Sequence, residues 1–350
     1  MHNSITDVAG LLVGNAHDAR LMSGVTAIVF DKPAVASVAI FGGASAGRDL
    51  GCLEPDAAVH HVDAIVLSGG SGFGLDAASG AQAWLREKGR GLVVGTAIVP
   101  IVPSAICFDL ANGGDKSWDR YPPYRELGYA ASAAATGAPV PLGTIGAGYG
   151  ASTVDLKGGL GSASAVTSSG FTVAALVVVN ALGSALMGAG PHFWAAPLEC
   201  DGEFGGLGMP REAIPTGPTW KGRQAGAAAD SPAHNPDQVP PSTTIACVAT
   251  DARLDKAQAR RLAIAAGAGL ARGLRVSHAL MDGDTIFAAS TRARAAEPAP
   301  ADQIEIGVLA ADCLSRAIAR AVFSATVPEA GAGLRWLGPP SWRDRFGGAG

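Results

Sequence analysis

Charged side chains are scarce in this chain, and neither sign dominates. Of 350 residues, 16% are Asp, Glu, Lys or Arg, and the formal net charge is −4. Such a chain offers no basic field for a phosphate backbone, which argues against nucleic acid as a partner. The 48% share of hydrophobic residues excludes a disordered chain and favours a compact body with a large core.

Cysteine is equally rare. The five cysteines lie far apart, at positions 52, 107, 200, 247 and 313. An odd number without short paired spacings argues against a disulfide framework or a zinc site, so we expect buried thiols. His60 and His61 lie just before Asp63, but no third ligand follows at a useful spacing, and no metal site is expected.

Long uninterrupted apolar runs are also missing. The most apolar segment, 171–189, contains Asn180, Gly183 and Gly188, which favours a buried strand and a turn over a membrane span. The first residues lack the basic start and the apolar run of a signal peptide. We therefore expect a cytoplasmic chain without a membrane partner.

Strand and helix signals alternate along the rest of the chain. Short β-branched runs predict strands at 24–30, 35–41, 64–67 and 172–179. Helix signals lie at 75–86, after the capping pattern of Asp255 to Gln258, and at about 304–321. This mixture predicts an α/β sandwich with helices outside two sheets. The Gly- and Arg-rich end, 331–350, is expected to fray.

Two glycine-rich segments, 43–47 and 68–74, resemble catalytic or ligand-binding motifs. The segment 43–47 matches the G-x-S-x-G pattern of serine hydrolases around Ser45, a pattern that requires a helix directly afterwards. The sequence instead breaks at Pro55, which weakens Ser45 as a nucleophile but leaves a serine hydrolase as an alternative. The turn at 68–74 fits no phosphate-binding pattern; it is either a close-packed turn or an anion acceptor at a helix start.

The junction between Ser242 and Thr243 separates two kinds of sequence. Residues 198–242 are rich in Gly, Pro, Asp and Asn without periodicity, which indicates a linker. A strand signal then begins abruptly at Thr243. If the Thr243 hydroxyl attacks the Ser242 carbonyl, an ester forms, and its hydrolysis leaves Thr243 as a new N-terminus.

Such a cleavage would put a nucleophile and its base on one residue. An α-amino group has a reference pKa of about 7.7 to 8.0, so near neutral pH part of it can accept the hydroxyl proton. Composition alone leaves a simpler explanation open, namely that the β-branched Thr243 merely suits a strand.

Several motifs, in order, make the chain similar to a known family. They include Gly-Ala-Gly-Tyr-Gly-Ala at 146–151 and Val-Val-Asn-Ala at 178–181. The others lie at 10–16, 65–78, 99–103, 157–164, 243–245, 249–252 and 281–288. Together they resemble the autoprocessing aminopeptidase and amidase family, which includes L-aminopeptidase/D-esterases, β-aminopeptidases and the nylon-oligomer endohydrolase.

The resemblance implies a four-layer αββα sandwich assembled from two fragments of one self-cleaved precursor, residues 1–242 and 243–350. It implies an N-terminal-nucleophile amidohydrolase or aminopeptidase without metal or cofactor, acting on small peptides, amino-acid amides or oligoamides. By the same resemblance, the processed two-chain units form a homo-oligomer. A ligand-binding protein of the same fold without activity is the alternative.

The resemblance also assigns site residues. It makes Thr243 the nucleophile and Asn180 a stabiliser of the oxyanion, because a side-chain amide can donate to the charge that develops on a carbonyl. It gives Asp282 and Asp284 the role of orienting the Thr243 ammonium. Alternate residues of an extended segment face the same way, although a plain hairpin turn would also explain the pair.

Three positions depart from the family pattern. Ser242 stands before the cleavage point, where relatives carry Asn or Gly. Asp155 stands at the spacing at which the nylon-oligomer branch has a catalytic Lys, which leaves Lys157 as the nearest substitute. Phe108 falls where that branch has a substrate-facing Tyr, so we expect Phe108 and Tyr149 to contact the substrate.

Overall fold

The computed structural model describes residues 1–214, 217–222, 241–329 and 333–347. The strands are β1 (Leu11–Asp18), β2 (Ser23–Ile40), β3 (Gly47–Arg48), β4 (Val62–Ser68), β5 (Leu92–Val94), β6 (Ala97–Val99), β7 (Ser104–Ile106), β8 (Leu160–Val166), β9 (Thr172–Asn180), β10 (Thr243–Thr250) and β11 (Thr285–Ser290). The α-helices are α1 (Ala77–Glu87), α2 (Tyr124–Ala133), α3 (Lys256–Gly273), α4 (Pro300–Phe323) and α5 (Trp342–Phe346).

A single long strand joins the two halves of the sheet. The first half of β2 pairs with β1 and β4, and its second half pairs with β11. The hydrogen-bonded order is therefore continuous, β3-β7-β4-β2-β11-β10-β9-β8, with β1 beside β2. The sequence predicted two strands here because the exposed residues 31–33 interrupt the apolar run; the structure corrects this to one strand with a register shift between Val29 and Ala34.

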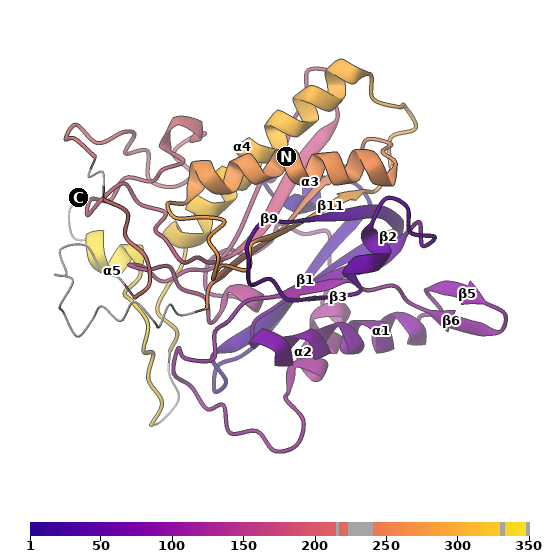
Figure 1. Cartoon of the computed structure of the whole chain (residues 1–350), viewed down its shortest axis with the longest axis horizontal. Helices are drawn as coiled ribbons and strands as arrows, with labels where there is room; N and C mark the ends of the chain where they lie inside the picture. The colour runs from indigo at the N-terminus through magenta and orange to yellow at the C-terminus, as the bar shows by residue number, and fades with distance from the viewer. Residues whose placement is uncertain (215–216, 223–240, 330–332, 348–350) are drawn as a thin grey trace.

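The elements form four layers (Figure 1). Helices α1 and α2 pack on β1, β2 and β4, whereas α3 and α4 cover β8, β9, β11 and the second half of β2. Between the two halves of the sheet lies a core to which both contribute, with Phe30 and Ile65 from one half and Leu176, Ile245 and Phe287 from the other. The predicted αββα sandwich is confirmed.

The predicted helices form, and their ends follow local signals. The Asp255 carboxylate accepts a hydrogen bond from the Gln258 backbone N–H, and the Gln258 side-chain oxygen accepts one from the Asp255 N–H, so α3 begins with the expected capping box. Helix α4 starts earlier than predicted, at Pro300. Proline is tolerated in the first turn because the N–H that it lacks would have no partner within the helix there. The expectation of a frayed end is wrong for α5, because Trp342 packs on Phe323 with ring centroids 4.8 Å apart.

Two further expectations change. Cys107, Cys247 and Cys313 are buried as predicted, whereas Cys52 is half-buried and Cys200 is exposed, since Cys200 directly precedes a surface turn. The start of the predicted linker is packed: Glu203 accepts a 2.6 Å bond from Arg316, and Phe204 is buried in the core shared with α3 and α4. The linker residues 215–216 and 223–240 lie outside the described residues.

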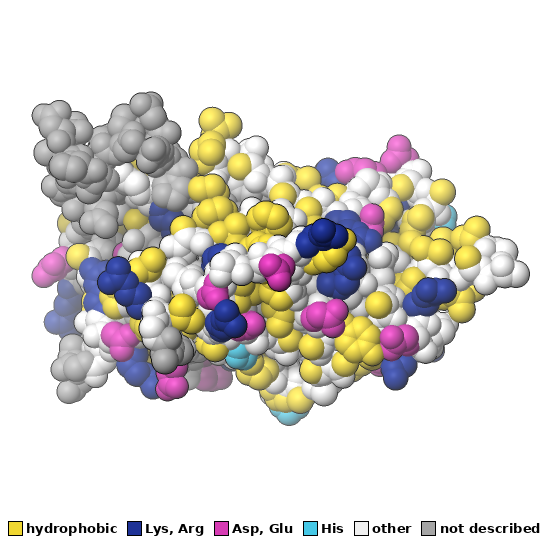
Figure 2. Space-filling view, turned by 90° about the horizontal axis from the view of Figure 1, so that it is seen from below, with side chains coloured by type: hydrophobic (Ala, Val, Ile, Leu, Met, Phe, Trp, Pro, Cys, Tyr) yellow, Lys and Arg dark blue, Asp and Glu magenta, His cyan; other side chains and the backbone are white. Residues whose placement is uncertain are grey.

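No helix in the described ranges combines the length and the apolar character that crossing a bilayer requires. Seen from the side of α1 and α2, basic, acidic and apolar side chains are interspersed rather than gathered by sign (Figure 2).

Candidate active site

Thr243 and Asn180 are direct cross-strand neighbours. Strand β10 pairs antiparallel with β9, and the register places Thr243 opposite Asn180. In β10, Ile245 and Cys247 face the core between the two halves of the sheet, so Thr243 faces the same side. Asn180 has the same parity as Val178, which belongs to that core too. The two side chains therefore leave neighbouring strand ends on one face, where paired Cβ atoms lie about 5 Å apart.

Two backbone groups hold the Asn180 side chain. Its amide nitrogen donates to the Phe108 carbonyl at 2.8 Å, and its oxygen accepts from the Ser152 N–H at 3.0 Å. Asn180 is only 1% exposed. Because its oxygen is occupied by a donor, the orientation that presents the amide N–H groups is fixed.

The Ser242 carbonyl receives two hydrogen bonds. The Thr243 hydroxyl donates to it at 2.5 Å, and the Gly283 N–H donates to it at 2.9 Å. Gly283 also lies against the Thr243 side chain, since a Cβ built on Gly283 would be 2.6 Å from Thr243 Oγ1. The Ser242 carbonyl is thus polarised, and the Thr243 hydroxyl is held next to it.

The Asp282 carboxyl lies beside this peptide and is buried. Asp282 forms a parallel bridge with Ser242, and its main-chain carbonyl accepts from the Ala44 N–H at 2.9 Å. Neither of its carboxyl oxygens has a hydrogen-bond partner among the described residues. Burial, together with the nearby Asp284 carboxyl, raises the pKa of Asp282 well above its usual range, and the charge of Lys221 opposes this increase.

Asp284 is held quite differently. One oxygen accepts from the Thr244 N–H at 2.9 Å and the other from the His278 N–H at 2.8 Å. The second oxygen also lies 3.2 Å from His278 Nδ1, and the His278 ring stacks on Phe41. Asp282 and Asp284 are therefore brought together, but Asp284 braces the backbone behind Thr243 whereas the Asp282 oxygens remain open.

Lys157 is buried in the loop that carries the Gly-Ala-Gly motif. Its ammonium donates to the carbonyls of Gly148, Ala151 and Gly158 at 2.7 to 3.1 Å. Burial lowers the pKa of Lys157 to about 7. These three bonds use every ammonium hydrogen, so the contacts of Lys157 are those of a loop brace.

Lys221 is the residue that sequence reasoning missed. Its ammonium donates to the Ser152 carbonyl at 2.9 Å, and the N–H of the same residue, Ser152, holds the Asn180 oxygen. Burial lowers the pKa of Lys221 to about 8, while the charge of Asp282 opposes the shift. Lys221 lies in the segment predicted as a linker and in no motif, so no local signal singled it out.

Phe108 and Tyr149, the two residues expected to contact the substrate, are placed differently relative to the site. Phe108 is half-buried and contributes its carbonyl to Asn180. Tyr149 is 7% exposed, and its ring stacks on His17 of β1 with centroids 4.3 Å apart. Burial raises the pKa of the Tyr149 hydroxyl. The structure thus places Phe108 at the site through its main chain and turns the Tyr149 ring toward β1.

The other candidate motifs have structural explanations. After Ser45 the chain forms the two-residue strand β3 and a 3-10 turn at Leu50–Leu53, not the helix that a nucleophile elbow needs. In the turn at 68–74, the Gly70 N–H donates to the buried Asp109 carboxylate at 2.8 Å, so an internal carboxylate occupies it. Among the described residues no cluster of three or more His, Cys, Asp or Glu side chains is arranged to hold a metal.

Comparison with known proteins identifies relatives along nearly the whole chain. The sequence profile described as peptidase family S58 matches residues 3–334. An uncharacterized aminopeptidase of Mycobacterium tuberculosis is 41% identical over 365 aligned positions, covering 99% of each chain. A 6-aminohexanoate-oligomer endohydrolase of Paenarthrobacter ureafaciens is 29% identical over 298 positions, 81% of this chain and 74% of the relative.

A solved structure shares the fold. The L-aminopeptidase D-Ala-esterase/amidase of Ochrobactrum anthropi, described as a variant of the Ntn hydrolase fold, superposes with a TM-score of 0.67 at 20% identity, covering 99% of this chain and 94% of that one. The resemblance predicted from the motifs is confirmed by these comparisons.

Proposed function

Since this chain belongs to peptidase family S58 and is an amide-bond hydrolase, we propose that it cuts its own backbone between Ser242 and Thr243 and then uses Thr243 as its nucleophile. One observation carries the proposal: the Thr243 hydroxyl and the Gly283 N–H converge on the Ser242 carbonyl. A donor aimed at a carbonyl oxygen stabilises the negative charge that develops there on attack.

Self-cleavage would proceed as an acyl shift followed by hydrolysis. Thr243 Oγ1 attacks the Ser242 carbonyl carbon, the C–N bond breaks, and the Thr243 nitrogen takes up a proton. Water then hydrolyses the ester, which gives a Ser242 carboxylate and restores the Thr243 hydroxyl. The new α-amine can accept the hydroxyl proton in later turnovers, because its reference pKa is about 7.7 to 8.0.

Cleavage would also free the position beside the Thr243 hydroxyl that a substrate carbonyl must occupy. Thr243 is 4% exposed, and Ser242, which precedes it, is also buried and pairs with Asp282. When Ser242 leaves, the Gly283 N–H and the Asn180 amide are left facing the Thr243 hydroxyl, and the substrate carbonyl would take the position of the Ser242 carbonyl. The Asp282 carboxyl, with its open oxygens, would then bind the new Thr243 ammonium.

Lys221 would position this constellation rather than touch the substrate. Its bond to the Ser152 carbonyl fixes the peptide that holds Asn180, and its charge favours the ionised form of Asp282. Lys221 would thereby supply the positive charge that the nylon-oligomer branch has in the Lys at the position of Asp155. Lys157, with three loop carbonyls as partners, would instead keep that loop in shape.

The substrate class that fits best is small peptides, amino-acid amides or oligoamides. Support comes from the relatives, whose names describe an aminopeptidase and a hydrolase of 6-aminohexanoate oligomers.

The decisive experiment is to follow the mass of the purified chain. The 34.9 kDa chain is expected to convert into two fragments, with the smaller one starting at Thr243 by N-terminal sequencing. Thr243→Ala should remain uncut and inactive, whereas Thr243→Ser should still be processed. Ser45→Ala serves as the control and should behave like the wild type. An active chain that stays in one piece would overturn the proposal, and a stable, inactive single chain would favour the ligand-binding alternative.

A further inference from the structure

A short hairpin, residues 151–158, holds the side chain of Asn180. Ser152 on its first arm pairs with Lys157 on its second arm. The Ser152 N–H donates to the Asn180 side-chain oxygen at 3.0 Å. A displacement of this hairpin would therefore move the donor that orients the Asn180 amide.

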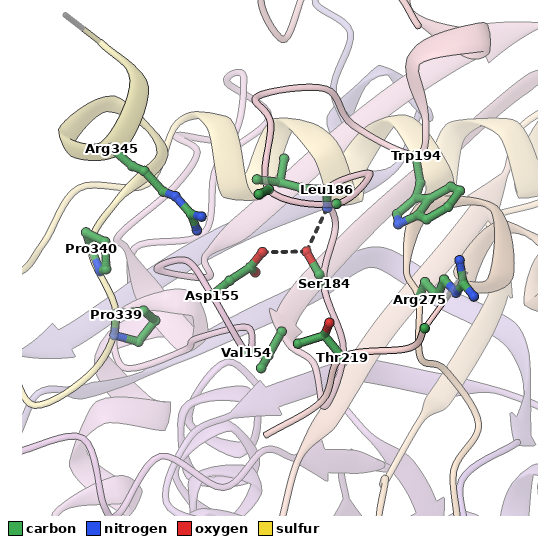
Figure 3. Close-up of a pocket in the computed structure, with 13 residues that line it drawn as sticks. Val154, Asp155, Ser184, Leu186, Trp194, Thr219, Arg275, Pro339, Pro340 and Arg345 are labelled. Atoms are coloured by element: carbon green, nitrogen blue, oxygen red, sulfur yellow. Dashed lines mark hydrogen bonds between the residues drawn. The ribbon is translucent and has the colours of Figure 1, made fainter. Parts of the chain in front are cut away.

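The tip of the hairpin borders a cavity rather than packed core. Val154 and Asp155 line this cavity, whose volume is about 520 Å³ (Figure 3). The Ser184 hydroxyl donates to the Asp155 carboxylate at 2.7 Å, and the Val154 N–H donates to the Gly183 carbonyl at 3.2 Å. A segment beside a cavity is held by fewer contacts than one in a packed core, so the contacts of the second arm matter more for its position.

The segment 333–347 supports the second arm. The Lys157 N–H donates to the Pro340 carbonyl at 2.7 Å, and Pro340 also lines the cavity in Figure 3. The Lys157 ammonium lies 5.2 Å from the centroid of the Trp336 ring, over its face. Lys157 is fully buried, so this cation–π contact is shielded from water, the setting in which such contacts are strongest.

The Trp336 ring is itself held in one orientation. Its indole N–H donates to the Pro339 carbonyl at 2.8 Å. Gly338 lies against the ring, since a Cβ built on Gly338 would be 2.3 Å from ring atom Cζ2. The Trp336 main chain pairs with Gly113. The ring can therefore act as a fixed platform for the Lys157 ammonium.

We propose that Trp336 is a positioning residue for Asn180. By fixing Lys157, it keeps the second arm of the hairpin in place beside Ser152. The Ser152 N–H then stays on the Asn180 oxygen, and the amide N–H groups of Asn180 stay directed at the attacked carbonyl. The inference rests on the proposed role of Asn180 in stabilising the oxyanion, and Trp336 itself touches no reacting atom.

Trp342 in the same segment offers a matched comparison. Its indole N–H donates to the Pro191 carbonyl at 3.1 Å, and its ring lies 4.8 Å from the Phe323 ring and 5.6 Å from the Phe346 ring, measured between centroids. These contacts hold the segment on α4 and lie outside the hairpin. Substituting each tryptophan in turn therefore separates support of the hairpin from general packing of the segment.

Amide hydrogen exchange tests the support of the hairpin without relying on hydrolysis. The full chain carries Thr243→Ala, so that every variant is a single polypeptide. Trp336→Leu should accelerate exchange in the peptide 151–158 by about tenfold, the usual effect of losing a shielded cation–π contact. Trp336→Phe keeps an aromatic face and should accelerate it by about threefold or less. Trp342→Leu should lower the melting temperature and leave exchange in 151–158 unchanged.

Kinetics of the chain with Thr243 test the link to Asn180. With alanine 4-nitroanilide as substrate, Trp336→Leu should lower kcat about tenfold, because a loosely held donor stabilises the transition state less. KM should change by less than about twofold, since the oxyanion is absent from the bound ground state. Trp336→Phe should restore most of kcat, and Trp342→Leu should keep the kcat of the wild type.

Unchanged exchange in Trp336→Leu, or equal acceleration in Trp336→Leu and Trp342→Leu, would overturn the inference. Faster exchange with an unchanged kcat would also overturn it, because the hairpin would then move without consequence for Asn180. If Trp336→Leu does not fold, Trp336→Phe and Trp342→Phe give the same comparison. A wild type that hydrolyses no amide would instead overturn the proposed function, and the exchange rates would still decide whether Trp336 holds the hairpin.

Discussion

Gly283 leaves no room for a side chain beside Thr243. A Cβ built on Gly283 would lie 2.6 Å from the Thr243 hydroxyl oxygen and 3.0 Å from its methyl carbon. The main chain at Gly283 does not need the left-handed region, so the requirement for glycine here is one of space.

Gly283→Ala is therefore expected to displace Thr243, the proposed nucleophile, while leaving the fold intact. A shift of about 1 Å can cost about a hundredfold in rate, so both self-cleavage and hydrolysis should fall by about that factor. The measurements are the rate at which the fragment 243–350 appears and kcat/KM on an amide substrate. Gly51→Ala is the control, because a Cβ there meets nothing within 4 Å. If Gly283→Ala is processed at the wild-type rate, the added Cβ does not disturb Thr243, and the proposed reason for glycine at position 283 is wrong.

Asn180→Ala should reduce turnover rather than substrate binding. Loss of one oxyanion donor lowers kcat by about a hundredfold to a thousandfold, with a much smaller change in KM. Asn112 offers a matched comparison, since its side-chain amide is also buried and donates to main-chain carbonyls, those of Met22 and Gly150, at 2.9 Å. Asn112→Ala should lower the melting temperature and leave kcat of the folded protein unchanged. Equal kcat in both variants would count against the role of Asn180.

Asp282→Asn should stabilise the uncut chain, and more so as the pH rises. The folded-state pKa of Asp282 lies above its usual value near 3.8, so the folded state binds the proton more tightly than the unfolded state. Between the reference pKa near 3.8 and the higher folded-state pKa of Asp282, the unfolding free energy of the chain with Asp282 falls as the pH rises, by up to about 1.4 kcal/mol per pH unit. The Asp282→Asn chain lacks this loss.

The comparison is urea unfolding of Asp282→Asn against Asp282, both in a Thr243→Ala background to prevent cleavage, at about pH 5 and about pH 7. A difference in unfolding free energy that does not grow with pH would mean that Asp282 is ionised at little cost.

The two buried lysines should behave differently. Lys157→Met leaves three carbonyls without their donor and should lower the unfolding free energy by about 2 to 3 kcal/mol. Lys221→Met removes a positive charge near Asp282, so the pKa of Asp282 should rise further and the acidic limb of the pH–rate profile should move to higher pH. Lys221→Arg keeps the charge and should shift that limb little. Identical profiles for Lys221→Met and the wild type would exclude the proposed influence on Asp282.

Much of the fold could be predicted because its signals are local. The capping box of α3, the run of β-branched residues in β9 and the turn before α1 each depend on residues within a few positions of one another. The continuity of the long strand β2 could not be predicted, because the exposed residues 31–33 locally resemble a strand end. Only the pairing of β2 with neighbouring strands on both sides of these residues makes it one strand.

The sequence by itself determined which groups are available: a hydroxyl at the start of a buried strand in Thr243, an amide at the end of another in Asn180, and acids at 282 and 284. Only the tertiary structure decided how they meet. Strand register places Asn180 opposite Thr243, backbone donors hold Asp284 and leave Asp282 open, and Lys221 arrives from a segment without any motif. Register, burial and charge contacts depend on residues far apart in the chain, so no local pattern encodes them.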